Sequence, residues 1–168
     1  MDDHDPTAID LEVDPRARRI SGVTFHGGIP FEIPVISQIE GDLWTGGCQD
    51  GLVLPDFFHH LVSLYPWERY EVRHDLTSER TFRMFDATDQ DTEDVDEIAR
   101  LVSDCIDDGP TLVHCQAGLN RSSLVAAAAI MQRGRTAEEA IGLLRDRRSP
   151  AVLCNEAFEA WLVEDYEP

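Results

Sequence analysis

The stretch HCQAGLNRS, residues 114–122, joins two apolar segments of different kinds. Residues 111–114 (TLVH) are typical of a short buried strand, whereas residues 122–131 (SSLVAAAAIM) are typical of a helix. The loop between them therefore ends at a helix N-terminus, where unpaired backbone N–H groups and the positive end of the helix dipole attract anions. This order of segments predicts a phosphate-sized anion site at the strand–helix junction.

Two residues of the loop predict that the site is reactive. The field at the helix terminus favours the thiolate of Cys115, which is the nucleophilic form of a cysteine. Arg121 carries a planar fork of donors that matches two phosphoryl oxygens, and Gly118 is free to adopt a positive φ. A free cysteine is more often a small core residue, but these neighbours argue against that interpretation. An arginine at a helix N-terminus is favourable only with an anion in front of it, so the loop predicts covalent phosphoryl transfer.

The pattern HCxxGxxRS resembles the active-site pattern of the cysteine-dependent protein phosphatases, and the short chain is similar to their dual-specificity branch. Residues 39–46 (IEGDLWTG) resemble the opening strand of that family. Residues 147–158 (RRSPAVLCNEAF) are similar to its closing segment, with Cys154 where a proline is usual. The resemblance covers roughly residues 36–165 and implies a phosphatase fold that needs no metal and no cofactor.

The resemblance also implies roles for the loop residues. Cys115 is the expected nucleophile, and Ser122 is expected to hydrogen-bond the sulfur and help it leave, besides starting the helix. His114 is expected to orient the loop and help keep the thiolate ionised, although a satisfied core histidine is the alternative. The expected phosphate-binding residues are Gln116, Ala117, Gly118, Leu119, Asn120 and Arg121.

The departing oxygen needs a proton from a general acid. The resemblance implies that this acid is an aspartate roughly thirty residues before the cysteine. The acidic run FDATDQDTED offers Asp86, Asp89 and Asp91. Asp86 follows a strand-like segment (TFRMF) and precedes Cys115 by 29 positions (115 − 86), so we assign the acid to Asp86. Asp89 could instead lie in a turn, and Asp91 could cap the following helix.

The implied activity is hydrolysis of phosphomonoesters on phosphotyrosine, with phosphoserine and phosphothreonine as further substrates, through a cysteinyl-phosphate intermediate. The short chain favours a shallow cleft. An RNA 5′-triphosphatase is the alternative within the superfamily, because Gly-x-Asn-Arg occurs in that branch too. A non-catalytic phosphate-binding adaptor and a sulfur transferase of the rhodanese type are further alternatives.

Composition limits the class of protein. The 168 residues suffice for one domain, and 42% hydrophobic residues is ordinary for a globular chain. The net charge of −19 opposes binding to nucleic acid and to anionic lipid. We expect a cytoplasmic monomer acting on phosphorylated proteins or peptides. No apolar run reaches the ~20 residues of a membrane span, and the four cysteines are scattered without a disulfide or zinc pattern.

The order of segments predicts an α/β fold with a central mixed, mostly parallel sheet, flanking helices and a helical C-terminal half. Residues 1–20 are expected to form an acidic mobile tail, residues 21–35 an edge hairpin or extended cover, and residues 36–168 the phosphatase domain. A strand is expected at 60–65, and residues 70–74 and 81–85 are either two strands or a strand and a loop. Helices are expected at 92–107, from the capping box Thr136-x-x-Glu139 to about 147, and after a cap at Asn155. The three tryptophans are expected to pack in or over the core, and Cys154 is a conceivable disulfide partner for Cys115 under oxidation.

Overall fold

The computed structural model describes residues 9–10, 21–26, 29–87 and 92–168, with side chains from residue 35 onward. Its centre is a five-stranded sheet in the order β4-β5-β8-β6-β7. Strands β5, β8, β6 and β7 are parallel, and β4 pairs with β5 in the antiparallel sense. The expected mixed, mostly parallel sheet is therefore confirmed. The strands are β4 (Ile36–Glu40), β5 (Leu43–Gly46), β6 (His60–Ser63), β7 (Ser78–Thr81) and β8 (Thr111–His114).

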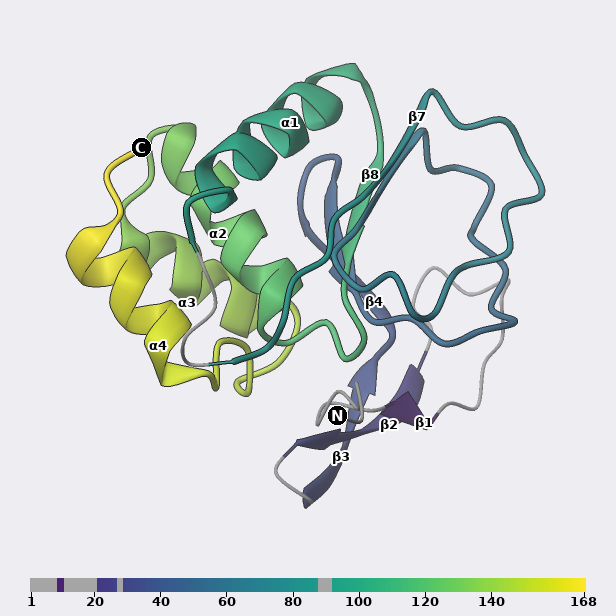
Figure 1. Cartoon of the computed structure of the whole chain (residues 1–168), viewed down its shortest axis with the longest axis horizontal. Helices are drawn as coiled ribbons and strands as arrows, with labels where there is room; N and C mark the ends of the chain where they lie inside the picture. Colours follow the sequence, from purple (N-terminus) through teal and green to yellow (C-terminus); the bar gives the residue numbers. More distant parts are fainter. Residues whose placement is uncertain (1–8, 11–20, 27–28, 88–91) are drawn as a thin grey trace.

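A second, antiparallel sheet precedes this one and contains β1 (Ile9–Asp10), β2 (Ser21–His26) and β3 (Ile29–Pro34). β2 and β3 pair along their whole length, from Ser21 with Pro34 to His26 with Ile29. β3 leads directly into β4, so the small sheet projects from one end of the molecule (Figure 1).

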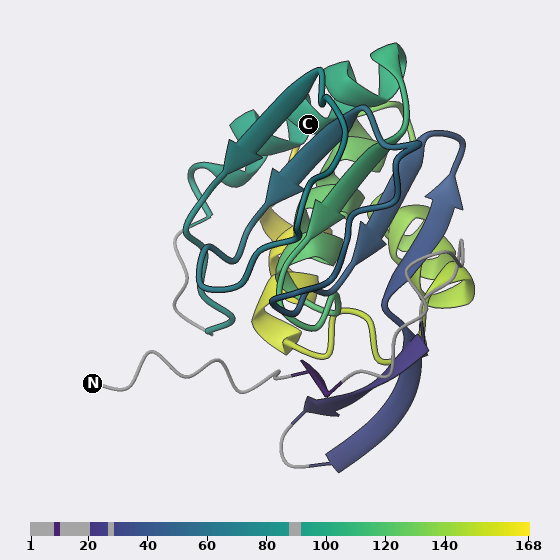
Figure 2. The same ribbon diagram turned by 90° about the vertical axis from the view of Figure 1, so that its right-hand side faces the viewer.

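The helices cover one face of the central sheet, as Figure 2 shows from the strand side. They are α1 (Val95–Asp108), α2 (Arg121–Gln132), α3 (Ala137–Arg147) and α4 (Glu156–Ala160), with a π-helical turn at Trp161–Asp165. Residues 121–131 of α2 are all buried, and residues 124–131 of this stretch are all apolar. α2 is thus the central helix, and packing on all sides fixes its N-terminus, which follows β8 after a loop of six residues.

Alternating side chains of the strands divide the core into two clusters, one on each face of the sheet. Val62 and Val113 point into the cluster beneath the helices. Leu61 and Leu112, their neighbours in β6 and β8, point into the second cluster, which is closed by irregular segments between the strands. All four residues of β8 are buried, so the strand is covered on both faces and residue 115 follows the end of a fully packed strand.

Several expectations on elements are confirmed. The capping box of α3 has both of its hydrogen bonds, between Thr136 and Glu139. Asn155 caps α4 by accepting the N–H of Ala157, at 3.1 Å. Trp44 is buried in the second cluster, and Trp67 and Trp161 are partly buried against the first.

Two expectations on strands are wrong. Residues 39–46 form no single opening strand, because Gly41 takes a φ of +53° and turns the chain between β4 and β5. Of the expected segments 70–74 and 81–85, only Thr81 belongs to a strand, because β7 occupies Ser78–Thr81. Glu71 makes only an isolated bridge to Val53. β7 is an edge strand with largely exposed side chains, so it lacks the apolar pattern by which buried strands are found in a sequence.

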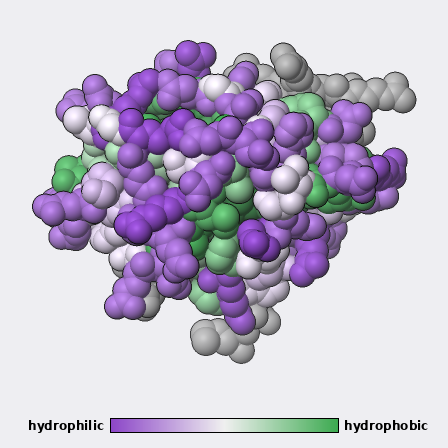
Figure 3. Space-filling model, turned by 90° about the horizontal axis from the view of Figure 1, so that it is seen from above, coloured by the Kyte–Doolittle hydropathy of each residue, from purple (hydrophilic) through white to green (hydrophobic). Residues whose placement is uncertain are grey.

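The surface is largely hydrophilic, with apolar atoms gathered near the centre of the face seen in Figure 3. Among the described residues, the model has no helix that is both long and apolar enough to cross a bilayer.

Candidate active site

The loop Cys115–Asn120 lies between the end of β8 and the start of α2. The backbone of β5 continues alongside it, since the N–H of Cys115 donates to the carbonyl of Gly46 at 3.1 Å. All six loop residues are buried, and Cys115 is only 1% exposed. The loop is therefore an internal structure whose conformation is set by contacts on every side.

Every carbonyl group of this loop accepts a hydrogen bond from a surrounding element. Such saturation is required where backbone polar groups are removed from water. The donors are His114 Nδ1 to Cys115 (3.2 Å), Cys48 N–H to Gln116 (2.8 Å), Arg148 Nη2 to Ala117 (3.0 Å), Arg148 Nε to Gly118 (2.5 Å), Leu153 N–H to Leu119 (2.9 Å) and Leu124 N–H to Asn120 (2.8 Å).

The direction of these carbonyls also decides where the loop N–H groups point. In a trans peptide the C=O of one residue and the N–H of the next are antiparallel. Carbonyls of residues 115–120 held by outside donors therefore leave the N–H groups of residues 116–121 facing the opposite side. Successive N–H groups on one side of a curved backbone form an anion-binding concavity, and the N-terminus of α2 adds its dipole.

Gly118 is required at the tightest point of this loop. Its φ is +69°, which L side chains rarely adopt, and a Cβ there would overlap the backbone carbonyl group of Gly46. The end of β5 thus contacts the loop closely enough to exclude any side chain at residue 118.

The buried sulfur of Cys115 has two polar neighbours, one in the loop and one in α2. The N–H of Gly118 donates to Sγ at 3.2 Å, and Ser122 Oγ lies 3.4 Å from Sγ within hydrogen-bond reach. A hydroxyl at that position can donate to a thiolate. Ser122 is the second residue of α2, so its position follows from the helix.

Arg121 begins α2 and is 1% exposed. Its Nη1 donates to the carbonyl of Met84 at 3.3 Å, and its guanidinium lies 5.0 Å from the centre of the Tyr65 ring. Burial lowers the pKa of Arg121 to about 9, which leaves the guanidinium protonated at neutral pH. A buried cation at a helix N-terminus is costly by itself, and an anion bound in the loop would offset that cost.

His114 is buried behind the loop, where the Tyr70 ring meets it edge-on at 5.2 Å. Burial lowers the pKa of His114 to about 4, against a smaller opposing effect of its bond to the Cys115 carbonyl. A carbonyl can only accept, so Nδ1 carries the proton of a neutral ring. His114 therefore acts on the loop by orienting a carbonyl, without a positive charge of its own.

Asp86 is the one candidate acid that the described residues include; Asp89 and Asp91 lie outside them. Asn120 Nδ2 donates to Asp86 Oδ2 at 2.7 Å, and Asn155 Nδ2 donates to Asp86 Oδ1 at 2.9 Å. Three segments distant in sequence thus meet at this carboxylate, and one of them is the loop that contains Cys115.

The protein-family model for the dual specificity phosphatase catalytic domain matches residues 62–167, which is more than half of the chain. The chain belongs to this family. No curated protein sequence matches it at a significant level. Membership makes it part of the cysteine-based phosphatase superfamily, as the loop pattern implies.

Solved structures similar to this dual specificity phosphatase domain share its fold at low identity. A mouse putative dual specificity phosphatase complexed with zinc tungstate is 20% identical, with a TM-score of 0.65 over 76% of this chain and 84% of that one. Human DUSP28 is 18% identical, with a TM-score of 0.66 over 77% and 90%. The human tyrosine phosphatase-like serine/threonine/tyrosine-interacting protein is 18% identical, with a TM-score of 0.62 over 76% and 92%.

Sequence reasoning missed two residues that shape the loop. Arg148 binds two loop carbonyls and also donates to Ser37 Oγ at 3.2 Å, and Asn155 binds Asp86 besides capping α4. Both belong to the closing segment that resembles the family, which was the only signal for them. Arg148 stands next to Arg147, and Asn155 was already expected to cap a helix. Neither residue type by itself therefore indicated a contact with the loop or with Asp86.

The cysteine chemistry of the phosphatase domain is limited by burial. All four cysteines are free thiols. Cys154 Sγ donates to Asn120 Oδ1 at 3.4 Å, and burial is the largest of the effects that raise its pKa. Its pairing with Cys115 under oxidation stays a prediction.

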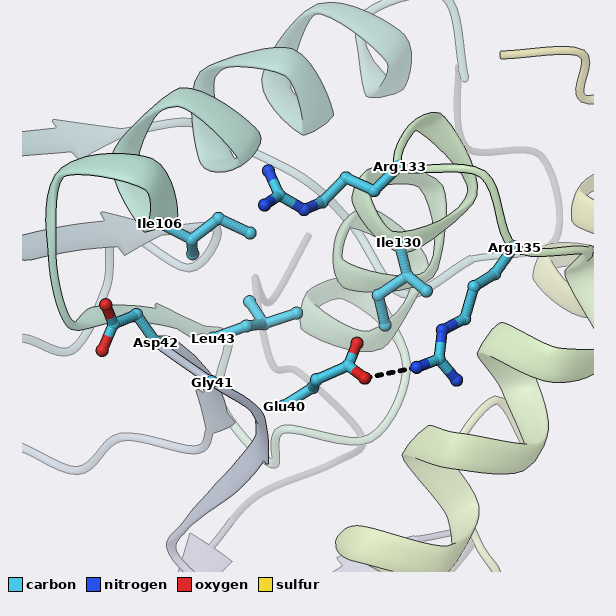
Figure 4. A pocket seen from close by; sticks show the side chains of 8 residues that line it. All are labelled: Glu40, Gly41, Asp42, Leu43, Ile106, Ile130, Arg133 and Arg135. Carbon is cyan, nitrogen blue, oxygen red and sulfur yellow. Dashed lines mark hydrogen bonds and ion pairs between the residues drawn. The ribbon is translucent and has the colours of Figure 1, made fainter.

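A pocket of about 350 Å³ lies at the other end of the sheet (Figure 4). Its lining includes Leu43, which pairs with Thr111 at the start of β8. The loop that contains Cys115 follows the opposite end of β8. Two of the residues that line the pocket, Arg135 and Glu40, form an ion pair with each other. This pocket is separate from the candidate active site.

The neutral state of His114 predicts a pH dependence of stability. The folded-state pKa lies below the ordinary 6.5, so the unfolded chain binds the extra proton first and stability falls as the pH drops from 6.5 to about 4. We expect His114 to account for a loss of roughly 3 kcal/mol over this window. His114→Asn keeps a donor for the carbonyl without a titrating ring, so the difference between the two urea-unfolding free energies should change with pH. Parallel curves would contradict the assignment.

The bonds of Arg148 predict that its removal deforms the loop. Arg148→Ala leaves two buried carbonyl groups without a hydrogen-bond donor, so it should lower the free energy of unfolding by roughly 2–5 kcal/mol. Hydrolysis of 4-nitrophenyl phosphate should fall more than about tenfold, because loop geometry is lost. Arg147→Ala is the matched control, since the Arg147 side chain is 60% exposed and should change both quantities little. Equal effects of the two substitutions would refute a special role of Arg148.

Proposed function

We propose that this protein hydrolyses phosphotyrosine, and phosphoserine and phosphothreonine as further substrates, through a cysteinyl-phosphate on Cys115. The observation that carries the proposal is the bond from Asn120 to Asp86, at 2.7 Å. It joins the candidate acid to the loop that holds the candidate nucleophile, so both reacting groups belong to one site. Phosphorylated proteins or peptides are the partners that such a site would take.

In the first step the phosphoryl oxygens bind to the N–H groups of residues 116–121 and to the Arg121 guanidinium. The Cys115 thiolate attacks phosphorus in line, so a P–S bond forms while the bond to the leaving oxygen breaks. Asp86 gives its proton to that oxygen, which departs as a phenol or alcohol. The loop stabilises the charge on the equatorial oxygens during the transfer.

In the second step water attacks the phosphorus of the cysteinyl-phosphate. The Asp86 carboxylate accepts a proton from this water, the P–S bond breaks, and inorganic phosphate leaves. Ser122 Oγ, 3.4 Å from the sulfur, donates a hydrogen bond that stabilises the returning thiolate. The cycle needs no metal ion.

Aromatic side chains near the loop support aryl phosphates as substrates. The Trp67 ring contacts the rings of Tyr65 and Phe85 in tilted arrangements, with centroids 4.9 and 5.6 Å apart. Tyr65 is the ring that lies 5.0 Å from the Arg121 guanidinium, and Phe85, which is 44% exposed, directly precedes Asp86. An apolar wall beside a deeply buried nucleophile suits a long, flat phosphotyrosine better than the shorter phosphoserine. We infer that phosphotyrosine is the better substrate.

Cys115→Ser should abolish turnover, because a serine hydroxyl at this position is not ionised near neutral pH. We expect the rate on phosphotyrosine peptide and 4-nitrophenyl phosphate to fall by at least about 10⁴-fold, while peptide binding by calorimetry persists. Cys105→Ser on α1 is the control and should retain activity.

Activity that survives Cys115→Ser would overturn the proposal, as would inhibition of the wild type by chelators. Release of γ-phosphate from triphosphate-ended RNA in preference to phosphopeptide hydrolysis would assign the same loop to RNA instead.

A further inference from the structure

Two side-chain amides bind the Asp86 carboxylate, one at each oxygen. Asn120 belongs to the catalytic loop and Asn155 to the first turn of α4. Each donates to a different carboxylate oxygen, at 2.7 and 2.9 Å, and Asn155 also donates to the carbonyl of Ala87 at 3.3 Å.

The orientation of both amides is fixed by backbone donors. Asn120 Oδ1 accepts the N–H of Asn155 at 2.9 Å, and Asn155 Oδ1 accepts the N–H of Ala157 at 3.1 Å. A backbone N–H can only donate, so these amide ends are oxygens and the opposite ends are NH₂ groups. Neither amide can rotate to accept a proton from Asp86 without losing its own bond.

We propose that Asn155, together with Asn120, is a positioning residue for Asp86; this inference rests on the proposed function. The two fixed donors align the carboxylate beside the catalytic loop, where the second step requires it as the base. Each carboxylate oxygen keeps a further lone pair, so a proton can still be carried there for the first step.

Asn155 has a second, purely structural role, and the two roles can be separated. Its Oδ1 caps α4, and a serine hydroxyl or an aspartate oxygen can make the same cap. Only the amide NH₂ reaches Asp86. Asn155→Ser therefore keeps the cap and removes the contact, whereas Asn155→Asp keeps the cap and sets a second carboxylate against Asp86.

The test is a double-mutant cycle on kcat with two esters, phenyl phosphate and 4-nitrophenyl phosphate. Phenolate is the poorer leaving group and depends more on proton donation. We expect Asn155→Ser to lower kcat about tenfold for phenyl phosphate and less for 4-nitrophenyl phosphate, with KM nearly unchanged. Asn155→Asp should lower it further. In an Asp86→Ala background neither substitution should have an additional effect.

Equal losses in the wild-type and Asp86→Ala backgrounds would show a merely structural role and overturn the inference alone. A thermal midpoint within a few degrees of wild type in either variant confirms that the cap is intact. A folded wild type that hydrolyses neither ester would overturn the proposed function, and this inference with it.

Discussion

Outward-facing carbonyl groups are the constraint on which the catalytic loop depends. Residues 115–120 have no regular secondary structure of their own, yet each carbonyl has a donor from elsewhere in the chain. Because peptide N–H groups oppose their carbonyls, the concave side of the loop is determined by what surrounds its convex side. The anion binding that we propose for this loop would thus be a property of the whole fold.

The groups that we propose to bind phosphate carry positive or partly positive charge, whereas the molecule as a whole is strongly negative. The net charge of −19 repels a phosphorylated substrate at long range. In the proposed mechanism, the helix terminus, the loop N–H groups and the buried Arg121 supply the attraction to phosphate, and low exposure strengthens each of these interactions. Screening by salt reduces the long-range repulsion much more than this buried attraction.

The proposed acid and base belong to the same network as the loop. Asp86 comes from the segment after β7, Asn120 from the loop and Asn155 from the start of α4. Asn155 caps the short helix α4 and also binds Asp86, so the position of this helix helps to determine where the carboxylate lies. Through this arrangement the closing segment, 40 positions beyond Cys115 at Asn155 (155 − 115), would bear on the proposed chemistry.

Local patterns in the amino-acid sequence were enough to predict several elements. The strand–loop–helix junction around Cys115, the buried α2, the capping box of α3 and the cap at Asn155 all follow from residues close in sequence. The edge strand β7 and the turn at Gly41 were missed, because exposed or permissive residues leave no apolar pattern. Which side chains surround the loop depends instead on the packed fold. Arg148, Cys48 and Leu153 reach its carbonyls, and Asn155 reaches Asp86, across separations that no local periodicity encodes. Contacts of this kind arise from packing of the sheet and helices, which brings distant donors and acceptors into hydrogen-bond range.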